Sequence, residues 1–131
     1  MLNYTSFYMS FLFLISSIIF QMGTVPFTNH RIILIFGNNT TLVQRQLVLL
    51  QKDSSGLAER DLIVKQVKPG DDLYVSYQIK PDEPFTIILI GKDGGEKYRS
   101  VNMLTTNHIF TIIDAMPMRQ AEMRRQKNEK R

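Results

Sequence analysis

The chain has 131 residues, a formal net charge of +4 and no cysteine. The lack of cysteine excludes disulfides, thiolate metal sites and thiol-based redox chemistry, because each of these needs a sulfur ligand or nucleophile. Residues 1–118 carry ten Lys/Arg and ten Asp/Glu, so the net charge lies entirely in residues 119–131. A neutral body with a basic tail argues against a broad nucleic-acid-binding face.

The amino-terminal segment is expected to be a targeting sequence rather than part of the folded domain. Residues 7–22 read FYMSFLFLISSIIFQM, and no charged side chain precedes Arg31. This run has the length of a signal peptide's apolar region with its margins, and it lies near the lower limit for a membrane span. We therefore expect residues 1–24 to be a signal peptide of an exported protein, periplasmic or secreted. An uncleaved membrane anchor and a buried amino-terminal element are the alternatives, because no basic residue precedes the run and no good cleavage site follows it.

The folded domain is predicted to begin with a strand over residues 31–36, RIILIF, which is apolar and rich in β-branched residues. Such a run is typical of a strand that is buried on both faces. Gly37, Asn38 and Asn39 then form a turn signal. Thr41 and Gln44 match a capping box, which predicts a helix over residues 42–52. The apolar face of this helix would hold Val43, Leu47 and Leu50. Residues 53–56, DSSG, are expected to end it.

The middle of the chain contains one ambiguous segment between two predicted strands. Residues 61–67, DLIVKQV, are predicted to be a strand that Pro69-Gly70 closes. In residues 71–79, alternating apolar side chains favour a strand, whereas Asp71 as a cap favours a short helix. The connector PDEP over residues 81–84 leads into a third strand over residues 85–90, FTIILI.

The last third is predicted to hold a hairpin and a helix. Residues 92–95, KDGG, supply the positive φ angles of a tight turn. The returning strand over residues 96–101 is polar and is expected at a sheet edge. Thr105 or Thr106 would cap a helix whose apolar face comprises Ile109, Ile112, Ile113 and Met116. Pro117 ends or kinks that helix. Residues 118–131 permit a helix and are expected to fray, with Arg119 and Glu122 paired to the body.

This order of elements predicts an α/β domain over residues 28–118, followed by a basic helical tail over residues 119–131. The order strand, helix, strand, helix, strand, strand, helix gives three layers, α/β/α, around a four-stranded mixed sheet. That is the arrangement of the thioredoxin fold. The domain is long enough to bury its own core, and we expect it to be a monomer.

Three blocks of the sequence resemble one family, DUF4174, a domain of unknown function that is also described as peroxiredoxin-like. They are Glu59–Leu62 (ERDL), Leu89–Ser100 (LIGKDGGEKYRS) and Asp114–Arg124 (DAMPMRQAEMR). The resemblance spans about residues 31–125, and the run MPMRQAEM is its most specific part. Members occur alone in exported bacterial proteins, and in animals in sushi-repeat-containing proteins and in matrix proteins such as equarin. The resemblance implies a thioredoxin-like fold, an extracytoplasmic setting and a helix over residues 71–79, but no established enzymatic activity.

Two short segments are candidate binding sites. The first, Asn38, Asn39, Thr40 and Thr41, lies where thioredoxins place their cysteine pair at a helix amino terminus. It would present N–H donors to an anion or a peptide carbonyl, or be only a turn and a cap. The second, Glu83 and Pro84, lies where such folds keep a cis-proline, and we predict a cis bond there. An extended peptide would pair beside it by strand addition; the alternative is a structural connector.

No catalytic constellation is evident in the sequence. His30 and His108 have no carboxylate or second ligand at a useful spacing, so no metal site or cofactor is expected. We expect a non-catalytic module that binds a protein or peptide and no nucleic acid, with residues 7–22 or the basic tail as points of membrane contact. The alternative is a non-thiol enzyme of the cell envelope that uses Asp71, Asp72 or His108 with a bound metal.

Overall fold

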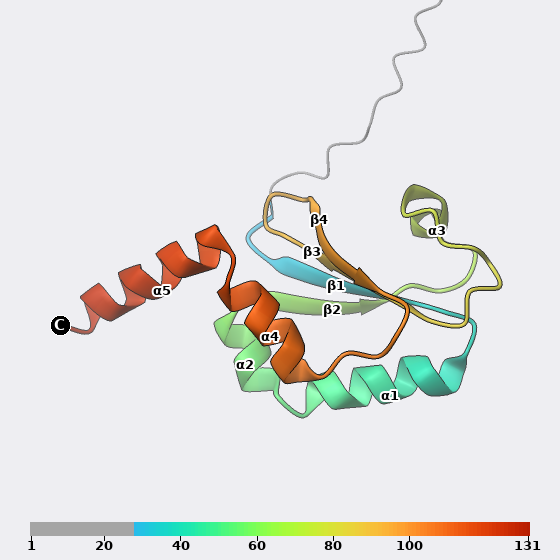
Figure 1. Ribbon diagram of the computed structural model, residues 1–131, viewed down its shortest axis with the longest axis horizontal. Helices are drawn as coiled ribbons and strands as arrows, with labels where there is room; N and C mark the ends of the chain where they lie inside the picture. The colour runs from blue at the N-terminus through green and yellow to red at the C-terminus, as the bar shows by residue number, and fades with distance from the viewer. Residues whose placement is uncertain (1–27) are drawn as a thin grey trace, which may run out of the picture.

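A computed structural model describes residues 28–131 and contains one four-stranded sheet (Figure 1). The strands are β1 (Arg31–Phe36), β2 (Leu62–Gln66), β3 (Thr86–Ile90) and β4 (Glu96–Ser100), in the order β2-β1-β3-β4. β1 runs parallel to β2 and antiparallel to β3, and β3 and β4 form an antiparallel pair. The predicted mixed sheet is confirmed. The targeting sequence predicted for residues 1–24 lies outside the described residues.

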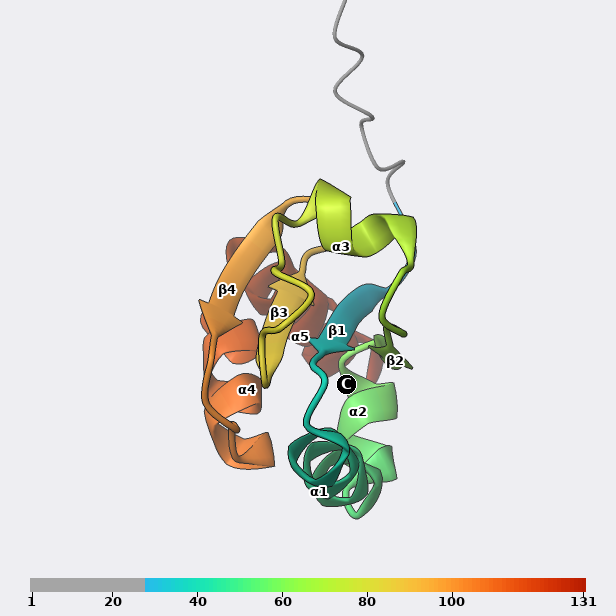
Figure 2. The ribbon, with the colours of Figure 1, turned by 90° about the vertical axis from the view of Figure 1, so that its right-hand side faces the viewer.

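The helices lie on both faces of the sheet (Figures 1 and 2). One face is covered by α1 (Thr40–Gln51), α2 (Ser54–Glu59) and α4 (Thr106–Asp114), and the other by the short α3 (Asp72–Ser76). α5 (Pro117–Glu129) extends away from one end of the sheet. The arrangement is three-layered and consistent with a thioredoxin-like α/β fold, although α3 makes the second helical layer thin. None of the helices within residues 28–131 is long and apolar enough to span a membrane.

The core consists of two apolar clusters that share the central strands. Beneath α1 and α4, Ile33 and Ile35 of β1 pack with Leu50 and Ile113. On the other face, Leu34 and Phe36 pack with Tyr74 of α3. Successive side chains of a strand point to opposite faces, so β1 needs apolar residues at every position. This explains the uninterrupted apolar run IILIF that follows Arg31, and it confirms that the strand is buried on both sides.

α1 differs from its prediction at its cap and on its buried face. It begins at Thr40, and the cap is Asn39, whose side chain accepts a hydrogen bond from the Leu42 N–H at 3.2 Å. The predicted capping box on Thr41 is wrong, because Thr41 already lies inside the helix. Gln46 is fully buried, because its side-chain amide hydrogen-bonds the backbone of Leu104 in both directions, at 2.9 and 2.8 Å. A polar residue therefore takes a core position that the apolar pattern alone does not reveal.

Two short helices, α2 and α3, occupy segments for which no helix was clearly predicted. α2 follows α1 at the predicted stop, with Asp53 as its cap accepting from the Gly56 N–H at 3.1 Å. α3 forms within residues 71–79, with Asp71 accepting from the Leu73 N–H at 2.9 Å. The ambiguity in residues 71–79 is thus resolved as a helix, as the family resemblance implied.

The carboxyl-terminal helices follow the predicted signals closely. Thr105 caps α4 by accepting from the His108 N–H at 3.2 Å. Pro117 occupies the first turn of α5, where its missing N–H costs nothing, so it separates two helices instead of kinking one. The tail is helical as far as Glu129, and this helix crosses the domain boundary predicted at residue 118. β4 lies at the sheet edge, as predicted.

Candidate functional site

The two predicted binding segments lie side by side beyond the carboxyl end of β1. The Asn38 N–H donates to the Glu83 carbonyl and the Asn39 N–H to the Pro84 carbonyl, both at 3.1 Å. Gly37 permits this close approach, because its φ is +148° and an added Cβ would lie 2.3 Å from the Pro84 oxygen. The structure thus joins two separate candidate segments into one pair of loops.

Most polar groups of this loop pair are already hydrogen-bonded within the protein. The Asn39 side chain caps α1, and the Asn38 side-chain amide donates to the Asp82 carbonyl at 3.3 Å. The Glu83 N–H donates to the Lys80 carbonyl at 3.0 Å, so both backbone groups of Glu83 are engaged. Strand addition at Glu83 would therefore have to break existing hydrogen bonds. The geometry agrees with a turn, a helix cap and a connector.

The cis bond predicted at Glu83-Pro84 is wrong, since residues 28–131 contain no cis peptide. The trans isomer is favoured by about 0.5–1 kcal/mol in X-Pro bonds. In this protein the carbonyls on either side of the bond both accept from the neighbouring loop in the trans arrangement. No local contact therefore selects the rarer isomer.

The residues proposed for a non-thiol enzyme do not form one site. Asp71 caps α3 on one face of the sheet, and Asp72 beside it is exposed. His108 lies on α4 on the opposite face, with its ring centroid 5.8 Å from that of Tyr98. Within the described part of the chain, no three His, Asp or Glu side chains are grouped so that they could hold a metal ion.

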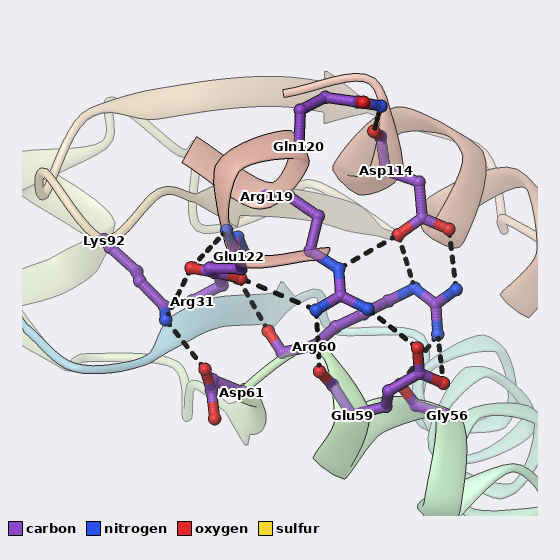
Figure 3. Close-up of polar contacts among 10 residues, drawn as sticks. All are labelled: Arg31, Gly56, Glu59, Arg60, Asp61, Lys92, Asp114, Arg119, Gln120 and Glu122. Atoms are coloured by element: carbon purple, nitrogen blue, oxygen red, sulfur yellow. Dashed lines mark hydrogen bonds and ion pairs between the residues drawn. The ribbon is translucent and has the colours of Figure 1, made fainter. Parts of the chain in front are cut away.

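A network of charged side chains lies at the other end of β1, beside its first residue (Figure 3). It is built from the α2–β2 turn, the β3–β4 hairpin and the α4–α5 junction, together with the start of β1. Four cations and four carboxylates take part, and they are Arg31, Arg60, Lys92, Arg119, Glu59, Asp61, Asp114 and Glu122. The three blocks that carry the family resemblance therefore meet at this network.

Arg119 joins the root of α5 to the α2–β2 turn. Its side chain is 1% exposed and donates to the carbonyl of Glu59 at 3.0 Å and to the Glu59 carboxylate at 2.8 Å. It also approaches Asp114 at 3.4 Å. Asp114 in turn accepts two hydrogen bonds from Arg60, at 3.0 and 2.6 Å, and Arg60 stacks 4.0 Å above the Phe110 ring. A bidentate, stacked arginine of this kind holds its neighbours in a fixed geometry.

Glu122 joins α5 to β1 and to the hairpin. It accepts from Arg31 at 3.2 and 3.3 Å and from Lys92 at 2.8 Å, and Lys92 also contacts Asp61 at 2.7 Å. The predicted pairing of Arg119 and Glu122 with the body is confirmed.

The titration of the network follows from these contacts. Burial raises the pKa of Glu122, but the hydrogen bonds and charges of Lys92 and Arg31 outweigh it and lower that pKa below its usual value. Asp114 behaves in the same way beside Arg60 and Arg119, and its pKa is also lowered. Burial lowers the pKa of Lys92, but Asp61 and Glu122 outweigh burial and raise it. All three groups are therefore held in their charged forms at neutral pH.

A cavity of about 350 Å³ opens beside the network, between the hairpin and the α4–α5 junction. We call it the hairpin pocket, and it is lined by Arg31, Gly91, Lys92, Asp93, Lys97, Met116, Pro117 and Met118. Its lining combines an apolar wall from the Met-Pro-Met run with three cations and one carboxylate. Arg31 is 1% exposed, and its Nε is a buried donor without a hydrogen-bond partner. Each of the three cations already pairs with a carboxylate, Arg31 and Lys92 with Glu122 and Lys97 with Asp93, so the pocket is suited to an apolar group.

The sequence did not predict most residues of this site as functional. Arg31, Arg60 and Asp114 had no distinctive spacing, because their partners lie far away in the chain. Two signals were present in retrospect. One is an arginine at the start of a wholly apolar strand, where a buried cation needs an anionic partner. The other signal is that each of the three family-like blocks contains both basic and acidic residues.

Comparison with known proteins identifies a family but no individual relative. No curated protein and no solved structure matches the chain. The family model described as "Domain of unknown function (DUF4174)" matches residues 27–122, which include the whole network and the hairpin pocket. The chain therefore belongs to the DUF4174 family, as the three blocks indicated.

Proposed function

We propose that this domain is a non-catalytic module that binds a protein or peptide segment in the hairpin pocket. The single observation that carries the proposal is the pocket itself, an apolar cavity with cations at its border, lined by residues of two of the three family-like blocks and by Arg31. Its volume of about 350 Å³ lies within the range of cavities that hold a ligand group. The chain has no cysteine that would support the thiol chemistry of related folds.

The lining suggests which segment would bind. Met116 and Met118 are flexible and polarizable, so they would adapt to an apolar side chain of the partner. Lys92 and Lys97 border the same cavity, but Glu122 and Asp93 already compensate their charges. The expected ligand is therefore a short segment with one large apolar residue as its anchor.

The walls of the pocket are held in place before any ligand arrives. Glu122 ties α5 to Lys92 of the hairpin, and Arg119 ties the same helix to Glu59. A site that is already ordered loses less conformational entropy on binding. The charged network thus has a supporting role in recognition.

Peptide selection tests this function directly. A random peptide library is selected on the immobilised protein, and the dissociation constant of each selected peptide is measured by fluorescence anisotropy. Met118 is 46% exposed, so Met118→Asp changes the pocket wall without touching the core. We expect this variant to weaken binding about tenfold or more.

Val75→Asp is the matched control, because Val75 is an apolar residue on α3 that is 83% exposed and distant from the pocket lining. It should leave the dissociation constant unchanged. Selected peptides that bind both variants and the wild type equally would contradict the proposed site.

We further propose that the protein works outside the cytoplasm, after export by residues 1–24. The apolar run over residues 7–22 supports this proposal, as does the setting implied by the family resemblance. Amino-terminal sequencing of the mature protein tests it. A start beyond residue 24 is expected, whereas a start at Met1 in the membrane fraction would favour the uncleaved anchor.

A further inference from the structure

The outer part of α5 carries all of the protein's net charge. Beyond Glu122, α5 extends away from the body (Figure 1). The segment over residues 124–131 is exposed throughout and contains five cations and one carboxylate, namely Arg124, Arg125, Lys127, Lys130, Arg131 and Glu129. Its net charge of five minus one equals the +4 of the whole chain. Among the contacts of residues 28–131, none of these five cations forms an ion pair, whereas the network at the root of the helix is fully paired.

Two of these cations, Arg124 and Lys127, lie on one side of the helix, because residues three apart project within about 60° of each other at 100° per residue. α5 ends at Glu129, and Lys130 and Arg131 add two cations at and beyond its carboxyl end. Like charges at such spacings repel one another and destabilise an isolated helix. The segment has no apolar residue beyond Met123, so it cannot insert into a hydrocarbon layer. A segment of this composition contacts a partner through charge.

We propose that the outer end of α5 and the residues after it dock on an anionic bilayer surface through Arg124, Lys127 and Arg131. This interaction is separate from peptide binding in the hairpin pocket. This inference rests on the export proposed for residues 1–24, which brings the chain to a membrane, so a bilayer and not a nucleic acid is the anionic surface chosen. The unpaired positive charge selects anionic over neutral lipid. Because the contact is electrostatic and exposed, salt weakens it.

Vesicle binding of the full-length chain tests the proposal. The partition coefficient is measured on neutral phosphatidylcholine vesicles and on vesicles with about 30% phosphatidylglycerol, and the ratio of the two removes the contribution of the apolar run. The triple variant Arg124→Gln/Lys127→Gln/Arg131→Gln is expected to lower this ratio about tenfold or more. The control triple variant Arg45→Gln/Lys65→Gln/Lys68→Gln removes the same charge from exposed positions on the body and should keep the wild-type ratio.

A salt titration of the wild-type chain gives a second test that does not depend on any variant folding. The ratio should fall steeply between about 0.1 M and about 0.5 M NaCl. Three results would each overturn the proposal. These are an unchanged ratio in the α5 variant, an equal fall in the body variant, and tighter binding to duplex DNA than to the anionic vesicles at the same salt concentration.

Discussion

Arg31 and Arg119 are buried cations, each only 1% exposed, and both depend on carboxylates from distant parts of the chain. The carboxylates are shared: Glu122 lies among Arg31, Lys92 and Arg119, and Asp114 lies between Arg60 and Arg119. Removing one member of such a group leaves a buried charge without compensation, which costs far more than losing an exposed pair.

Glu122→Gln should therefore destabilise the protein strongly. We expect the free energy of unfolding to fall by about 2–4 kcal/mol, because Arg31, Lys92 and Arg119 lose a common partner. The matched control is Glu96→Gln, which breaks the more exposed Glu96–Arg99 pair of 2.7 Å and should cost about 1 kcal/mol or less. Urea unfolding followed by circular dichroism measures both. Equal losses in the two variants would contradict a buried network.

The lowered pKa values of Asp114 and Glu122 predict the direction of the pH dependence. In the unfolded chain these groups bind protons near their usual pKa of about 4, whereas in the folded protein they bind them only at lower pH. The stability that Asp114 and Glu122 contribute is thus complete above the unfolded-state pKa. It is lost as the pH falls through the lower pKa values that these groups have in the folded protein. The raised pKa of Lys92 acts oppositely, and its contribution is lost only above about pH 10.

We therefore expect the urea midpoint to fall between about pH 5 and about pH 2, and to fall less steeply in Glu122→Gln. The midpoint should be measured for wild type and variant across this range. Identical pH profiles would show that Glu122 is not held ionised by its neighbours.

At the scale of elements, the amino terminus of α1 has a different cap from the predicted one. Asn39 accepts from the Leu42 N–H, whereas Thr41 lies within the helix. Asn39→Ala should cost about 1 kcal/mol of stability and Thr41→Ala about 0.5 kcal/mol or less, as measured by urea unfolding. The opposite order would show that the capping box on Thr41 operates after all.

The two central strands, β1 and β3, were predictable because each contains a continuous apolar run. Short runs of this kind are typical of strands that are buried on both faces. The short helices were harder. α2 has six residues and no apolar period, and α3 has five residues whose pattern also suits a strand. Gln46 was missed because its burial depends on hydrogen bonds to Leu104, which is distant in the sequence. The errors thus lie where tertiary contacts override local pattern.

At the scale of the whole molecule, the two ends of β1 differ in chemistry. Beyond its carboxyl end, where thioredoxins hold cysteines, amides and backbone groups bond one another. Beside its amino end lie the charged network and the hairpin pocket. The loop beyond the carboxyl end of β1 could be predicted because it directly follows a predicted strand. The charged network and the hairpin pocket could not be predicted, because their residues come from four separate segments of the chain.

The cysteine-free chain should have no thiol redox activity. Peroxidase and disulfide-reductase assays with a complete reducing system are expected to give rates equal to the protein-free blank. Turnover that copurifies with the protein and disappears on its denaturation would contradict this expectation.

Recognition at the hairpin pocket is tested most directly by mapping a selected peptide onto the ¹⁵N-labelled protein by NMR. The account predicts that the amide shifts will concentrate in residues 91–97 and at Met116 and Met118. Shifts concentrated instead at Asn38–Thr41 and Glu83, with none around the pocket, would contradict it.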